Sequence, residues 1–135
     1  MHVYERTVRF EEVDAAQIVF FARYLSYAHE AMESLLGALE GGYVRLVSER
    51  KVGMPAVHVD IDYKAPARFG DALRIEVDVP HVGSKSCVYR YRVKKVADDT
   101  LLAEMTHTCV VSDLVRLKGI EIPDDVRALL ELHRV

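Results

Sequence analysis

Residues 11–25, "EEVDAAQIVFFARYL", place one carboxylate, Asp14, just upstream of an apolar run that leads into a segment with helical periodicity. A carboxylate can attack a carbonyl carbon, or it can activate a water molecule that does so. The N-terminus of a helix presents unpaired backbone N–H groups, which can polarise the oxygen of the same carbonyl. An acid beside a helix end in an apolar setting is therefore a candidate site for acyl transfer.

Asp14 also has a purely structural interpretation, because Asp is among the preferred N-cap residues of helices. In that case "DAAQIV" begins a helical turn and the carboxylate satisfies backbone N–H groups of its own segment. The spacing alone leaves both interpretations open.

Other polar side chains form simpler patterns. His29 and Glu33 stand four residues apart on the expected helix, a spacing that a metal pair or a dehydratase could use, but no further ligand converges on them. His58, Asp60 and Asp62 share one face of an expected strand, where a solvated or interface face is the simpler interpretation. We therefore expect no metal site.

The element that must position Asp14 is a helix over residues 22–36, where apolar side chains recur at spacings of three and four. Residues 42–52 are ambiguous and could form a second, short helix. Pro123, Asp124 and Asp125 open a short amphipathic helix near the end of the chain. The apolar stripe of the long helix comprises Tyr24, Leu25, Tyr27, Ala28, Ala31, Met32, Leu35 and Leu36.

Five stretches alternate between apolar and polar residues, which is typical of an antiparallel sheet with one covered face. The first covers residues 2–10, and four follow the helix. The pattern predicts an α+β fold in which the long helix lies across the apolar face of a five-stranded sheet. The apolar positions are Val3, Val8 and Phe10; Val57, Val59, Ile61 and Tyr63; Leu73, Ile75, Val77 and Val79; Cys87, Tyr89, Tyr91 and Val93; and Leu101, Ala103, Met105, Cys109 and Val111.

The bulk properties exclude several classes of protein. A chain of 135 residues fits one domain, residues 1–135, and its net charge of −3 argues against a nucleic-acid partner. No apolar run approaches the roughly 20 residues that a membrane span needs. Two scattered cysteines and an N-terminus unlike a signal peptide indicate a cytoplasmic protein. Because an isolated sheet leaves edges, we expect a homodimer or homotetramer.

Three segments carry a family resemblance that spans about residues 4–113. "VDAAQIVFFARYL" resembles the D-x-x-G-x-V-x-(Y/F/H)-x-x-Y motif of the 4-hydroxybenzoyl-CoA thioesterase family, and "DYKAPARFGDAL" resembles its Y-x-x-P-A-x-x-G-D-x-L segment. "VGSKSCVYRYRV" is similar to the hairpin that follows, and the N-terminal third also resembles the 1,4-dihydroxy-2-naphthoyl-CoA hydrolases of the same branch. The resemblance implies a hotdog fold, in which a five-stranded antiparallel sheet wraps around one long central helix.

The same resemblance implies an acyl-CoA thioesterase that needs no cofactor, since CoA is part of the substrate. Asp14 matches the catalytic nucleophile or general base, and Phe21 matches the position whose backbone N–H faces the thioester oxygen. A dehydratase of the same fold and a non-catalytic acyl-CoA-binding module are the alternatives. The expected substrate-binding residues are Gln17, Ile18, Phe20, Tyr24, Arg68, Phe69, Gly70, Ser84 and Lys85.

Two positions depart from the family pattern and bear on the acyl group. Gln17 stands where many members have Gly, and its amide adds a donor and an acceptor near the acid, so we expect it to tune specificity. Phe21 stands where members that act on short aliphatic acyl groups have His. This difference favours an aromatic or longer apolar acyl group.

Overall fold

The computed structural model describes all 135 residues, which fold around one antiparallel sheet with the strand order β1-β4-β5-β6-β3. A second, small sheet has the order β2-β7-β8. The large sheet comprises β1 (His2–Thr7), β3 (Ala56–Tyr63), β4 (Ala72–Val82), β5 (Ser86–Lys95) and β6 (Leu101–Val110), and the small sheet comprises β2 (Val52–Gly53), β7 (Ser112–Asp113) and β8 (Lys118–Gly119). The predicted five-stranded antiparallel sheet is confirmed.

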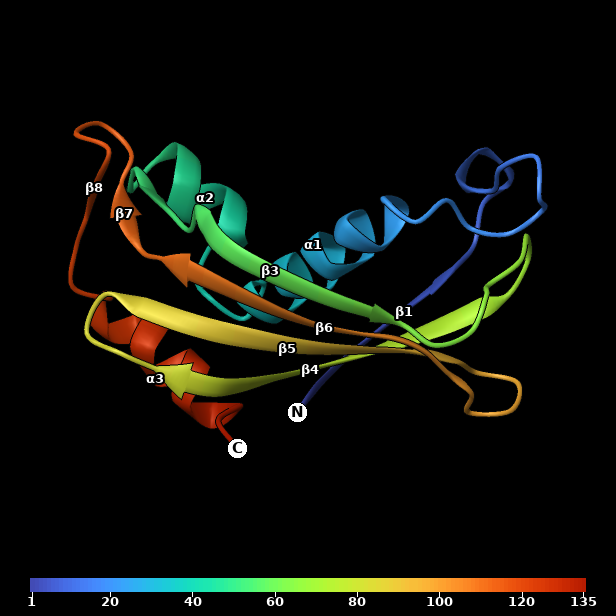
Figure 1. The fold of residues 1–135 in the computed structure, drawn as a ribbon. Helices are drawn as coiled ribbons and strands as arrows, with labels where there is room; N and C mark the ends of the chain where they lie inside the picture. The colour runs from blue at the N-terminus through green and yellow to red at the C-terminus, as the bar shows by residue number, and fades with distance from the viewer.

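The long helix α1 (Arg23–Leu36) packs on the concave side of this curved sheet, as Figure 1 shows. Its apolar stripe is buried from Tyr24 to Leu36 and joins the inward faces of β4 and β5 in one core, except at Leu25, which was predicted to belong to the stripe but is 47% exposed. Each large apolar side chain removed from water stabilises the fold by roughly 1.5–3 kcal/mol. The central helix predicted over residues 22–36 is therefore present, and its burial against the sheet explains the α+β architecture.

Three shorter helices complete the chain. The 3-10 helix η1 (Phe10–Glu12) precedes the Asp14 turn. The ambiguous segment 42–52 forms the helix α2 (Gly42–Ser48) and, at Val52, the start of β2. The predicted C-terminal helix is α3 (Asp124–Leu132), which buries Val126, Leu129 and Leu130 beside β4. None of the helices combines the length and apolar character that a membrane crossing requires.

The structure corrects three of the predicted apolar faces, those of β1, β6 and β3. In β1, Val3 and the following Phe10 are exposed, whereas the side chains that turn toward α1 belong to the polar residues Tyr4 and Arg6. Long polar side chains can cover apolar surface when their ends find partners, and here those partners are acidic residues of α1 and η1. In β6, the core takes Leu102 instead of Leu101, because the β5–β6 register shifts near Val93.

The largest correction concerns β3. The predicted core face is exposed in the single chain, by 61% at Val57, 41% at Val59 and 47% at Tyr63, and only Ile61 is partly buried. The reason is topological: β3 is the last strand of the sheet and pairs with β6 alone, while α1 packs toward β4 and β1 at the other side. An apolar edge strand of this length is a template for pairing with a further strand.

We predict that β3 pairs with β3 of a second copy, so that the protein sediments as a dimer or larger homo-oligomer at micromolar concentration. Val57→Lys should weaken this association, because a lysine at a strand edge opposes pairing. The matched control is Val115→Lys, at a site that is 75% exposed in the β7–β8 turn. A wild-type monomer in sedimentation velocity, or equal effects of both substitutions, would contradict the prediction.

Candidate functional site

Asp14 lies at the start of a tight turn that the backbone closes on both sides. Its N–H donates to the carbonyl oxygen of Ile18 at 3.0 Å, and its own carbonyl oxygen accepts from the N–H of Gln17 at 2.8 Å. The carboxylate accepts a hydrogen bond from the N–H of Ala16 at 2.8 Å through Oδ1. Asp14 therefore stabilises its own exposed turn. The structural interpretation is therefore right that the carboxylate satisfies a backbone N–H of its own segment, although that segment is a turn and not helical, and the N-cap of α1 is Ala22.

Gln17 has a backbone φ of +66°, in the left-handed region that favours glycine. The turn requires this conformation in order to return the chain toward Ile18. The side chain is exposed and lines a hollow together with Asp14. The family preference for Gly at this position thus has a backbone reason, in addition to the free space that glycine leaves beside the acid.

The N-terminus of α1 is open to solvent at Phe21, which is 63% exposed. The N–H groups of Phe21 and Ala22 make no hydrogen bond within the chain. The carbonyl oxygen of Phe21 accepts a hydrogen bond from the hydroxyl of Tyr63 at 2.8 Å, which holds this peptide against the end of β3. The helix end therefore has free donors in a backbone that is itself fixed.

The structure brings several of the predicted substrate-binding residues together. Asp14, Gln17, Arg68 and Phe69 line one open hollow, and the Val19 N–H bonds the carbonyl oxygen of Ala67 at 2.9 Å to join the two loops. A positive φ of +86° at Gly70 turns the second loop back toward β4.

The remaining predicted residues lie beside this hollow or far from it. Phe20 packs on Phe21 with ring centroids 4.7 Å apart, Ile18 is half-buried, and Tyr24 is buried against Tyr63. Ser84 and Lys85 are different, because the β4–β5 turn lies beside α3, at the opposite end of the sheet from the segment that joins β1 to α1 and carries Asp14 (Figure 1). A single chain does not bring them to the hollow, and their role in substrate binding stays a prediction.

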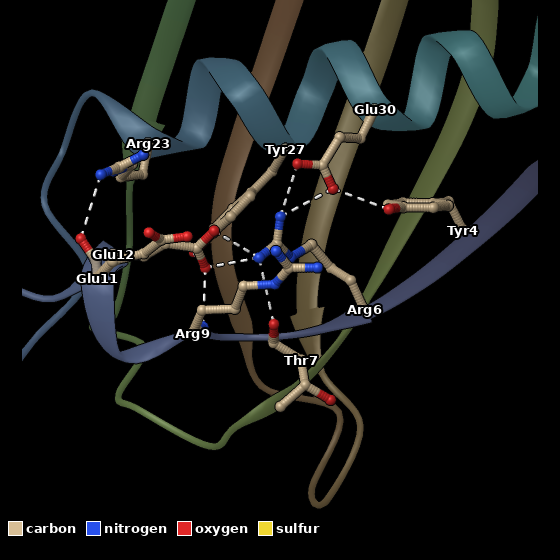
Figure 2. Close-up of polar contacts among 9 residues, drawn as sticks. All are labelled: Tyr4, Arg6, Thr7, Arg9, Glu11, Glu12, Arg23, Tyr27 and Glu30. Carbon is tan, nitrogen blue, oxygen red and sulfur yellow. Dashed lines mark hydrogen bonds and ion pairs between the residues drawn. The ribbon is translucent and has the colours of Figure 1, made fainter.

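A partly buried ion cluster that joins β1, η1 and α1 was not predicted from the sequence. Figure 2 shows the Arg6 guanidinium between two carboxylates: Nη2 lies 2.6 and 2.5 Å from the oxygens of Glu12, and Nη1 lies 2.8 and 2.6 Å from those of Glu30. The guanidinium also stacks over the ring of Tyr27, 4.4 Å from its centroid. Tyr4 donates a further hydrogen bond to Glu30 at 2.8 Å.

Glu12 connects this cluster to both halves of the candidate site. Its Oε1 accepts from the Tyr27 hydroxyl and the Arg9 N–H, both at 2.9 Å, and its carbonyl oxygen accepts from the Phe20 N–H at 2.9 Å. Asp14 follows two residues later, and Phe20 adjoins the end of α1. One buried residue therefore sets the position of the acid relative to the helix end.

The environment of Glu12 shifts its pKa in two opposing ways. Burial raises the pKa, but hydrogen bonds from Arg9 N–H and the Tyr27 hydroxyl, together with Arg6, outweigh burial and lower the pKa below its ordinary value. A carboxylate with a lowered folded-state pKa stabilises the fold above its unfolded pKa of about 4.3. That contribution is lost as the pH falls through the folded-state pKa.

The sequence contained a weak signal for this cluster. Tyr4 and Arg6 alternate on one side of the first strand, and Tyr27 lies on the apolar stripe of the helix. A tyrosine in a buried stripe requires a partner for its hydroxyl, and an arginine on an inward strand face requires an acid. Nothing in the spacing identifies Glu12 rather than Glu11 as that acid.

Comparisons with known proteins give a consistent assignment. A family described as the thioesterase-like superfamily matches residues 8–130. A 1,4-dihydroxy-2-naphthoyl-CoA hydrolase of Synechococcus elongatus is 36% identical over 110 residues, which cover 81% of each chain. The crystal structure of a 1,4-dihydroxy-2-naphthoyl-CoA thioesterase from Synechocystis superposes with a TM-score of 0.86 at 27% identity, covering 96% of this chain and 94% of that one. A gentisyl-coenzyme A thioesterase structure has a TM-score of 0.83 at 29% identity, covering 93% and 98%.

We predict that Glu12→Gln lowers the free energy of unfolding at pH 7 by about 1–3 kcal/mol, because Arg6 then keeps only one carboxylate partner. The stability of the variant should also fall less than that of the wild type between pH 5 and pH 3. Urea unfolding at each pH measures both effects. Glu30→Gln is the comparison and should cost less, because the Glu30 side chain is 35% exposed. Equal losses in the two variants would show that Glu12 contributes no more to the free energy of unfolding than Glu30 does.

Gln17→Gly should raise the free energy of unfolding by roughly 0.5–1 kcal/mol, since glycine adopts a positive φ without strain. We expect it also to change the order in which acyl-CoA substrates are preferred, because the amide leaves the hollow beside Asp14. Gln17→Ala separates the two effects: it removes the amide but keeps a Cβ in the strained conformation. The stability gain should therefore be absent in Gln17→Ala, while the change in substrate order is shared. An unchanged order in both variants would show that the amide does not reach the substrate.

Proposed function

The chain belongs to the thioesterase-like superfamily and is an enzyme that hydrolyses acyl-CoA thioesters, and from that premise we propose that Asp14 and the backbone N–H of Phe21 act on the thioester carbonyl. The observation that carries the proposal is the arrangement around Glu12. This residue holds the start of the Asp14 turn and the approach to α1 in one hydrogen-bonded unit.

The chemical role of Asp14 follows from its free oxygen. Oδ1 is engaged by the N–H of Ala16, whereas Oδ2 makes no hydrogen bond within the chain. A carboxylate held by one oxygen keeps its orientation and offers the other oxygen to a carbonyl carbon or to a water molecule. This geometry suits both nucleophilic and general-base catalysis by Asp14.

The role of the helix end is electrostatic. As the carbonyl carbon is attacked, negative charge develops on its oxygen, and donors that are already aligned stabilise that charge without reorganisation. The free N–H of Phe21 is such a donor, and the helix dipole adds to its effect. Tyr63 supports this function from the other side of the peptide by holding the carbonyl oxygen of Phe21.

The reaction balances in either mechanism. With Asp14 as nucleophile, Oδ2 forms an anhydride with the acyl carbon as the C–S bond breaks, the CoA thiolate takes a proton, and water then hydrolyses the anhydride. With Asp14 as general base, the carboxylate takes a proton from water as the hydroxide oxygen bonds the carbonyl carbon. The tetrahedral intermediate then breaks its C–S bond, and the departing CoA thiolate takes the proton from Asp14. The products are the same: a free carboxylic acid and CoA thiol.

The two ends of the substrate face different surroundings in this proposal. The acyl end is an aromatic or medium-length apolar group, which the exposed rings of Phe20 and Phe21 favour and which agrees with the aromatic acyl groups in the relatives' names. Arg68 stands beside Asp14 in the hollow and is suited to a phosphate of CoA.

The β4–β5 turn with Lys85 would contribute to the CoA site only from a second subunit, in the expected homodimer or homotetramer. We also propose that the protein is located in the cytoplasm.

Asp14→Asn should lower kcat for acyl-CoA hydrolysis by on the order of a hundredfold or more, because the amide neither attacks a carbonyl nor takes a proton from water. Release of CoA thiol from a panel of acyl-CoAs measures the effect. Asp124→Asn, in the exposed first turn of α3, is the matched control and should leave kcat unchanged.

The same assay separates the alternatives. An acyl-CoA-binding module would bind the panel without releasing thiol, and a dehydratase would change the acyl chain while the thioester stays intact. Near-wild-type turnover in a folded Asp14→Asn variant would reduce Asp14 to a residue that shapes its turn.

A further inference from the structure

A second cavity, separate from the Asp14 hollow, lies between α1, α2 and the strands β3, β5 and β6. Its volume is about 330 Å³, and nine of its eleven lining residues are hydrophobic. The two exceptions are His29 on α1 and His107 on β6. An apolar cavity with a few convergent polar groups is the usual form of a small-molecule site.

The cavity begins close to the end of α1. Leu25, which lines it, comes one helical turn after Phe21, and Ala28 and Met32 continue the same wall along the helix. With a rise of about 1.5 Å per residue, these positions extend the cavity over roughly 10 Å from Leu25 to Met32. An acyl group whose thioester lies at the N–H of Phe21 would therefore point along α1 into this space.

The walls suit a flat ring system. Met32, Met54 and Met105 contribute flexible, polarisable thioethers, and Tyr43 and Tyr91 contribute aromatic faces. A cavity of about 150 Å³ is enough to hold benzene, so a cavity of about twice that size holds one ring or two fused rings.

His107 is unusual because of the face it occupies. It lies between Met105 and Cys109 on the inward side of β6, where its neighbours are fully buried apolar residues. Its ring stacks with Tyr91 and packs on Tyr89, at centroid distances of 6.3 and 5.7 Å. Nδ1 lies 3.3 Å from the Tyr91 hydroxyl, whereas Nε2 makes no hydrogen bond within the chain.

The ring has one hydrogen-bonding atom to spare. Burial, and secondarily the charge of His29, lowers the pKa of His107, so the ring is neutral near pH 7. In a neutral imidazole one nitrogen donates and the other accepts. Whichever role Nδ1 takes toward Tyr91, Nε2 keeps the complementary role for a group in the cavity.

From this geometry we propose that His107 is a specificity-determining residue, which hydrogen-bonds a polar substituent such as a hydroxyl on a one- or two-ring acyl group seated between α1 and β6. The inference rests on the proposed function, because it takes the thioester to lie at Phe21. It places the ring-bearing end of the substrate in a cavity that Asp14 does not line. A polar atom in an apolar wall costs free energy when it is left unpaired, so a ring without the substituent binds less well.

The test compares benzoyl-CoA with its three monohydroxylated isomers as substrates. The wild type should prefer at least one hydroxylated isomer over benzoyl-CoA by roughly 10- to 100-fold in kcat/KM. His107→Phe keeps the ring stacking but removes the nitrogen atoms, and it should abolish this preference while benzoyl-CoA is still hydrolysed. His107→Gln, which restores a hydrogen-bonding group, should recover part of the preference. Thr106→Val, which neighbours His107 on β6 but does not line the cavity, is the control and should affect all four substrates alike.

Two results would overturn the inference. The first is a wild type with no preference for any hydroxylated isomer, a result that needs no variant to fold. The second is an equal loss on all four substrates in a folded His107→Phe variant, which would make His107 a packing residue only. Either result leaves the proposed role of Asp14 intact, because that role is tested separately by the loss of turnover expected for Asp14→Asn on every substrate. Conversely, an active Asp14→Asn enzyme that still depends on His107 for its preference would refute the proposed catalytic centre alone.

Discussion

The buried guanidinium of Arg6 is the interaction on which the site depends. It is shared by Glu12 and Glu30, which come from η1 and α1, so that one cation joins the edge strand, the loop and the helix (Figure 2). Two carboxylates on one side of a sheet would repel each other without it, and a buried arginine without acids would be costly. The cluster is therefore stable only when β1, η1 and α1 are all in place. The Asp14 turn is held by this requirement even though the turn itself is exposed.

The candidate catalytic centre is open to solvent within one chain, and this has a structural cause. The end of α1 has no side-chain cap, β3 has no strand on its outer side, and four phenylalanines near the hollow, Phe10, Phe20, Phe21 and Phe69, are exposed. Each of these features is unfavourable in water and becomes favourable when a second surface covers it. In the proposed function, the substrate and a second subunit cover these exposed features.

With the cavity beside α1 as the acyl site, the residues that recognise the acyl group are separate from the residues proposed for catalysis. In the proposed mechanism, Asp14 and Phe21 act on atoms that every acyl-CoA shares, and so they do not discriminate between acyl groups. The space lined by Leu25, Met32 and His107 lies further along the helix, where only the acyl group reaches. This division lets substitutions in the cavity wall change specificity while the position of the acid, set by Glu12, stays the same.

The sequence by itself determined the elements and the acid. Alternation and helical spacing are local properties, so they located the central helix at residues 22–36, four of the five strands closely, and Asp14 before the helix. They did not show that Val57, Val59 and Tyr63 lie on an edge strand, because strand order depends on pairings between distant segments. Nor did they reveal the Arg6–Glu12–Glu30 cluster or the position of His107 over the cavity, since these unite residues that are far apart in the chain. Only the tertiary structure decided them, because folding determines which partners come within hydrogen-bond distance of a buried charge or of a ring nitrogen.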